Sequence, residues 1–135
     1  MKRIDFLKKL SGVASMLVLP LNHLRTRKKT WLLKFHVRGF QYYKGPALIT
    51  RMRKGEILKL VREPANKYDR HAIAIHYQDH KIGFVPAEKN EVLSRLLDSE
   101  GSTLLAEIIN VEQDANPWEA VSAGIYLAQS TGLAA

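Results

Sequence analysis

The sequence has no cysteine among its 135 residues, only 13 acidic residues and no long hydrophobic run. The absence of cysteine excludes disulfide scaffolds, thiol catalysis and Cys-ligated zinc sites. A membrane-spanning helix needs about 20 predominantly apolar residues, and no stretch of the chain reaches that length. The sequence does have 46% hydrophobic and 25% charged residues, which excludes a wholly disordered chain. These features predict one small basic domain with a tail.

Basic residues are concentrated in the first half of the chain, although the net charge is only +8. Residues 1–30 hold eight basic residues and one acid, and residues 31–70 hold ten and three. Residues 71–135 hold three basic residues and nine acids. This asymmetry favours a polyanionic partner, either a nucleic acid or, for the tail, an anionic membrane. The alternative is that the charge serves solubility alone.

Residues 1–30 resemble a targeting segment. Basic residues precede an apolar patch at 13–21, which is the layout of a secretory signal. Residues 3–8 also resemble a twin-arginine signal, except that Ile4 stands in place of the second arginine. The alternative is an amphipathic helix with a linker, on an anionic membrane or on the protein surface. Localisation therefore stays open between the cytoplasm and export to the envelope.

From residue 31 onward, the alternation of apolar and polar residues is typical of short strands. A helix is expected from Pro86 to Gly101, with Val92, Leu93, Leu96 and Leu97 buried. Residues 47–52 are expected to be helical or irregular. The prediction for residues 31–130 is a mainly β fold, a small barrel like the oligonucleotide/oligosaccharide-binding (OB) fold with one or two short helices. The expected strands are 31–37, 56–62, 72–77, 81–85, 104–111 and 120–127.

Three segments carry a recognisable pattern. Residues 37–43 read Val-Arg-Gly-Phe-Gln-Tyr-Tyr, residues 62–73 read Arg-Glu-Pro-Ala-Asn-Lys-Tyr-Asp-Arg-His-Ala-Ile, and residues 81–86 read Lys-Ile-Gly-Phe-Val-Pro. Over about residues 34–128 the chain resembles the HIRAN domain. The resemblance implies an OB-like barrel that captures single-stranded DNA, notably a free 3′ end. Such domains are modules of DNA-repair helicases and translocases, and they also occur alone in short bacterial proteins.

The predicted binding residues lie beside turns, where aromatic faces can stack bases and cations can follow phosphates. The resemblance assigns base stacking to Tyr42 and Tyr68, and hydrogen bonding of a terminal sugar hydroxyl to Asp69. A carboxylate suits a hydroxyl better than a phosphate. The alternative is a turn in which Asp69 caps its own backbone and Tyr68 covers the barrel mouth. The predicted nucleic-acid-binding residues are Tyr42, Tyr43, Tyr68, Asp69, Arg38, Lys44, Lys67, Arg70, Lys81 and Phe84.

Two positions depart from the family pattern. Gln41 stands where better-studied members carry a basic residue before the tyrosine, and Pro86-Ala87 occupies the neighbourhood in which they offer a lysine. The loss of both cations lowers the expected affinity for phosphate, so that 3′-end capture is expected to be weak or absent.

No catalytic constellation, metal site or cofactor is predicted. The Gly-x4-Gly-Lys-Ser/Thr pattern of ATPases is absent, so any helicase motor would be a separate protein. His71 and His76 are expected on opposite faces of one strand, as are Glu56 and Glu63, which disfavours a metal site and a nuclease. The prediction is a non-catalytic module that binds single-stranded DNA. The alternative is an exported or membrane-associated module that binds a protein or a glycan through the same barrel face.

Overall fold

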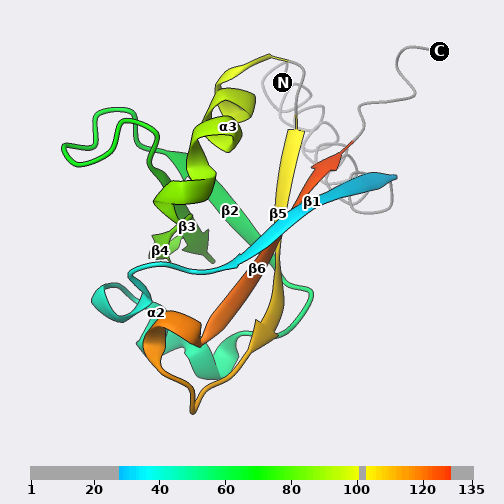
Figure 1. Ribbon diagram of the computed structural model, residues 1–135. Coiled ribbons are helices and arrows are strands. Elements are labelled where there is room, and N and C mark those ends of the chain that lie inside the picture. Colours follow the sequence, from blue (N-terminus) through cyan, green and yellow to red (C-terminus); the bar gives the residue numbers. More distant parts are fainter. Residues whose placement is uncertain (1–27, 101–102, 129–135) are drawn as a thin grey trace, which may run out of the picture.

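The computed structural model describes residues 28–100 and 103–128 (Figure 1). All but the last three residues of the predicted signal-like segment at 1–30 lie outside this part of the chain. The six expected strands and both expected helical stretches are present, and the first strand begins at Lys29. The elements are β1 (Lys29–His36), η1 (Phe40–Tyr42), α2 (Gly45–Leu48), η2 (Ile49–Arg51), β2 (Ile57–Arg62), β3 (Ile73–Tyr77), β4 (His80–Phe84), α3 (Ala87–Asp98), β5 (Thr103–Val111), η3 (Pro117–Glu119) and β6 (Val121–Ala128).

The strands form one antiparallel sheet in the order β1-β6-β5-β2-β3-β4. The prediction of a mainly β, OB-like fold is confirmed, although the sheet is not closed into a complete barrel. Among the described residues, the edge strands meet only at a single bridge between Arg38, just beyond β1, and Phe84 in β4. The ladder goes no further because Gly39 has a left-handed backbone, with a φ of 72°, and turns the chain into η1.

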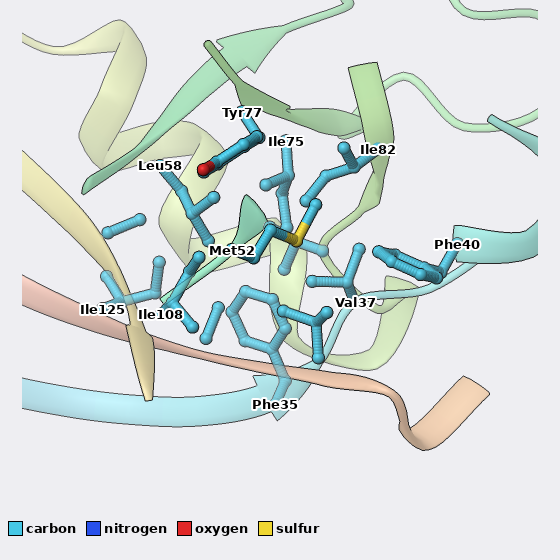
Figure 2. Close-up of a cluster of buried hydrophobic side chains, with 14 of the residues drawn as sticks. Phe35, Val37, Phe40, Met52, Leu58, Ile75, Tyr77, Ile82, Ile108 and Ile125 are labelled. Carbon is cyan, nitrogen blue, oxygen red and sulfur yellow. The ribbon is translucent and has the colours of Figure 1, made fainter. Parts of the chain in front are cut away.

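The curved sheet encloses a core of large apolar side chains. These come from all parts of the sheet, including its two edge strands, β1 and β4 (Figure 2). Burying each side chain of this size contributes about 1.5–3 kcal/mol, so the core holds the two halves of the sheet together. The side chains labelled in Figure 2 are Phe35, Val37, Phe40, Met52, Leu58, Ile75, Tyr77, Ile82, Ile108 and Ile125.

Helix α3 differs from the prediction at one of its four expected core residues, Val92. Val92 was expected in the core, but its side chain is 66% exposed. The buried face of the helix instead carries Asn90, Leu93 and Ser94, at the i, i+3, i+4 spacing of one helical face. Leu97 extends this face and packs against the core cluster. The side chains of Asn90 and Ser94 contact Asp69 and His71 in the loop between β2 and β3. This loop projects beside the helix (Figure 1).

Candidate nucleic-acid interface

The loop between β2 and β3 is folded around the side chain of Asn66. Its Oδ1 accepts the backbone N–H groups of Tyr68 and Asp69, at 2.9 and 3.1 Å. Its Nδ2 donates to Glu63 Oε1 at 3.1 Å. Asparagine favours such turns because its short amide can replace a backbone partner. The ring of Tyr68 consequently stands 96% exposed on a loop whose backbone is held from within.

Arg62, the last residue of β2, holds the far end of the same loop. Its guanidinium donates to the carbonyl oxygens of Ala72, at 2.7 Å, and Arg70, at 3.0 Å. The same group donates to Asp98 at the end of α3, with Nε 3.0 Å from Oδ1. A planar guanidinium can serve several acceptors at once. The loop is thus fixed to both the sheet and the helix, which limits the entropy lost when Tyr68 meets a ligand.

The carboxylate of Asp69 accepts one hydrogen bond at each oxygen. The backbone N–H of His71 lies 2.8 Å from Oδ1, and Asn90 Nδ2 lies 2.7 Å from Oδ2. The amide of Asn90 and then the N–H of His71 favour the charged form and hold the pKa of Asp69 below its ordinary value. Asp69 does cap its own backbone, as the alternative interpretation expects, but Tyr68 points outward and does not cover the interior.

A cleft of about 340 Å³ lies between the loop, the end of β4 and the start of α3. It brings together six of the ten predicted residues, namely Arg38, Tyr43, Tyr68, Asp69, Lys81 and Phe84. The remaining lining residues are Glu63, Asn66, Ala72, Val85, Ala87 and Asn90.

Both basic residues of this cleft are already paired with acids. Lys81 Nζ lies 2.6 Å from Glu63 Oε2, and an Arg38 nitrogen lies 3.2 Å from Glu88 Oε2. Partial burial opposes ionisation of Glu63, but hydrogen bonds from Lys81 and Asn66 outweigh it and lower its pKa. The cleft therefore holds nearly balanced charge, which gives little attraction for phosphate compared with an unpaired basic groove.

Aromatic rings form one wall of the cleft. The rings of Tyr43 and Phe84 meet edge to face, with their centroids 5.7 Å apart. Lys81 Nζ lies over both rings, 4.6 Å from the Phe84 centroid and 5.2 Å from that of Tyr43. These cation–π contacts with the two rings fix the position of the Lys81 ammonium group.

The other predicted residues lie outside this cleft. Tyr42, 78% exposed, lines an adjoining groove of about 550 Å³, which also includes Arg38 and Gln41. Lys44 is exposed beside Tyr42 in a separate hollow. The exposed Lys67 and Arg70 line neither the cleft nor the adjoining groove.

Sequence reasoning missed several residues of these surfaces. Trp118 is 57% exposed and lines the groove with Tyr42. Glu63 and Asn66 also line the cleft, although neither is among the predicted binding residues. Asn90 was not among the predicted residues. It lies three positions before the apolar Leu93, and this helical spacing indicates a polar residue on the buried face of the helix.

No group of three or more His, Asp or Glu side chains in residues 28–100 and 103–128 could hold a metal ion. No helix in those residues is both long enough and apolar enough to span a membrane. Ala87 lines the cleft at the position where the family pattern offers a cation, and it contributes no charge.

The comparisons with known proteins agree with this fold. A model of the HIRAN domain matches residues 32–129. A solved protein from Lactobacillus plantarum is 24% identical, with a TM-score of 0.65, over 76% of this chain and 97% of that one. The solved HIRAN domain of human HLTF is 20% identical, with a TM-score of 0.59, over 76% and 81%. No curated protein matches the sequence. The shared fold is OB-like. The chain therefore belongs to the HIRAN domain family, which is known as a family of DNA-binding modules.

Proposed function

We propose that residues 31–130 bind single-stranded DNA without catalysis and hold its terminal nucleotide, at a free 3′ end, with low affinity in the cleft beside Tyr68. The observation that carries this proposal is the contrast between the nearly fully exposed ring of Tyr68 and its internally fastened backbone. An aromatic face held in this way can stack a base at a small entropic cost. Stacking contributes about 1–3 kcal/mol per base.

Asp69 supplies the preference for a chain end. Its pKa is lowered, so it is an ionised acceptor at neutral pH. A carboxylate accepts a hydrogen bond from a terminal sugar hydroxyl and repels a terminal phosphate. The neighbouring groove, with Tyr42 and Trp118, adjoins the cleft at Arg38 and offers further aromatic faces to preceding nucleotides.

Fluorescence anisotropy with a 5′-labelled oligonucleotide tests the proposal. We expect Tyr68→Ala to raise the Kd about tenfold for any end, because one stacking platform is lost. Asp69→Ala is expected to raise it only for a 3′-hydroxyl end. Trp31→Ala is the matched control, because Trp31 is an exposed aromatic residue on β1 that lines neither the cleft nor the groove. If neither Tyr68→Ala nor Asp69→Ala changes the Kd, the DNA is held by attraction of its phosphates to basic residues outside the cleft, and the proposal is contradicted.

The alternative function, an exported or membrane-associated module that binds a protein or glycan, has one supporting observation. The charge balance of the cleft, with aromatic walls and carboxylates, also suits a sugar ring. Fusion of residues 1–30 to a reporter distinguishes the two: export would separate the domain from chromosomal DNA. Retention in the cytoplasm would favour DNA and a separate helicase as partners.

A further inference from the structure

Asn90 is an unusual residue for its position. Apart from the tyrosine hydroxyl of Tyr77, the polar side chains buried within the described part of the protein are those of Asn90 and Ser94, and Asn90 is 3% exposed. Burying an amide costs free energy unless its hydrogen bonds are replaced. The Nδ2 group of Asn90 finds its partner in Asp69 Oδ2, at 2.7 Å, across 21 positions of the sequence. The buried amide is therefore directed at the one carboxylate to which we assign the recognition of a chain end.

The two hydrogen bonds of Asp69 fix the plane of its carboxylate. The donor at Oδ1 is the backbone of His71 in the loop, and the donor at Oδ2 comes from α3. An ionised carboxylate has about four acceptor positions, so two protein donors leave capacity for a ligand hydroxyl. Without Asn90, the loop backbone alone would orient the group. Asn90 itself is also one of the residues that line the cleft.

We propose that Asn90 is a positioning residue, which aims the free acceptor positions of Asp69 at the terminal hydroxyl of a bound strand. This inference rests on the proposed function. It assigns part of the preference for a 3′-hydroxyl end to helix α3. The family-motif residues Tyr68 and Asp69 lie in the loop between β2 and β3, outside this helix. The bond itself is charge-assisted and short, which makes it among the stronger hydrogen bonds a protein offers.

Ser94 provides a matched control on the same helix. Its side chain is buried as deeply as that of Asn90, and it lies one turn further along α3. Its hydroxyl donates to the carbonyl oxygen of Glu91, at 2.7 Å, and lies 3.2 Å from His71 Nδ1. Ser94→Ala thus removes a buried polar group from this face of α3 without touching Asp69. Any general loosening of the helix is expected in both variants.

The experiment compares oligonucleotides that end in a 3′-hydroxyl and in a 3′-phosphate. We expect Asn90→Ala to raise the Kd for the hydroxyl end about tenfold and to leave the phosphate end nearly unchanged, because a charge-assisted contact loses its orientation. Ser94→Ala is expected to preserve the ratio of the two affinities. In an Asp69→Ala background, Asn90→Ala is expected to have no further effect on that ratio, since the two residues act as one unit.

A ligand-free measurement keeps the inference testable on its own. An NMR titration of the Asp69 carboxyl group is expected to show a higher pKa in Asn90→Ala than in Ser94→Ala. The inference is overturned if Asn90→Ala leaves the affinity ratio unchanged, or if it changes that ratio equally when Asp69 is absent. These results leave the proposed function standing, provided that Tyr68→Ala still weakens binding. Loss of the Tyr68 effect overturns the proposed function, and with it the role of Asn90 in binding.

Discussion

The backbones of Arg38 and Phe84 exchange two hydrogen bonds, of 2.9 and 2.8 Å, at the only bridge between the two edge strands in the described part of the sheet. Both side chains line the cleft. The bridge therefore sets the distance between two walls of the cleft. The fold and the candidate site depend on this same contact.

Gly83 permits that contact. Its φ of 152° disfavours any other residue, and a Cβ atom there would lie 2.4 Å from the carbonyl oxygen of Arg38. Backbone atoms cannot move aside as a flexible side chain can, so we expect Gly83→Ala to lower the free energy of unfolding by about 2–4 kcal/mol. Urea denaturation measures the change. Gly55→Ala is the control: its φ is 92°, but no atom lies within 4 Å, so a loss near 1 kcal/mol is expected. Equal losses at the two glycines would contradict this role for the bridge.

The local pattern of the sequence was sufficient for the strands. The strands are short apolar stretches bounded by turn-forming residues. The turn between β3 and β4 falls at Gln78 and Asp79, whose backbones have positive φ values. The exposed position of Tyr68 also followed from a polar loop with turn-forming residues. These features depend on residues that are close together in the sequence, so they can be predicted from one sequence alone.

Features that depend on distant segments could not be predicted in the same way. The pairing of Glu63 with Lys81 requires the register between two strands, and no local pattern contains it. The burial of Val92 was predicted wrongly, whereas that of Leu93 was predicted correctly. Both residues are apolar, and only the packing of the helix decides which of them is buried. The edge-strand bridge likewise depends on where Gly39 ends the first strand.

Tyr77 is expected to couple stability to alkaline pH. Its hydroxyl lies in the core and donates to acceptors at the carbonyl of Arg51, 3.0 Å away, and the carboxylate of Glu56, 3.1 Å away. Burial and then the Glu56 carboxylate raise the pKa of Tyr77 above its ordinary value near 10. A raised pKa means that this stabilisation is complete below about pH 10 and is lost as the pH rises toward the folded-state pKa.

We expect Tyr77→Phe to lower the free energy of unfolding by about 1–2 kcal/mol at pH 7, because two acceptors lose their donor. Above about pH 10, the difference between the variant and the wild type should shrink. Denaturation curves at pH 7 and pH 10.5 provide the measurement. Tyr42→Phe, which changes an exposed tyrosine, is expected to stay within about 0.5 kcal/mol of the wild type. A difference that grows with pH would contradict the assigned sign.

Restoring a cation at the start of α3 should strengthen binding if the cleft holds a nucleic-acid strand. Ala87 is exposed and lines the cleft. We expect Ala87→Lys to lower the Kd for single-stranded DNA about threefold in low salt and to steepen the salt dependence by about 0.7 in slope, the value for one additional phosphate contact. A lysine near a helix N-terminus costs about 0.3–1 kcal/mol of stability. Ala47→Lys adds the same charge to α2, outside the cleft, and is expected to change the slope much less.

The ion pair between Glu63 and Lys81 should restrain DNA binding. Glu63→Gln keeps an oxygen that accepts from Asn66, but it frees the Lys81 ammonium group beside the aromatic wall. We expect the variant to bind single-stranded DNA about threefold more tightly in low salt, with a slope steeper by about 0.7, because one more cation can contact phosphate. The end preference should weaken, since phosphate attraction contributes equally to every end.

The control for that change is another acid in an ion pair on α3. Glu91 pairs with Arg95 at 2.7 Å on an exposed part of the helix and does not line the cleft. Glu91→Gln alters the net charge of the protein by the same amount, so it reports the effect of overall charge alone. Anisotropy titrations at several salt concentrations compare the two variants. If both change the slope equally, the charge balance of the cleft has no special role. A larger change for Glu63→Gln would mean that the cleft itself meets phosphate, and that its paired lysine keeps the affinity low enough for a chain end to be distinguished from the interior of a strand.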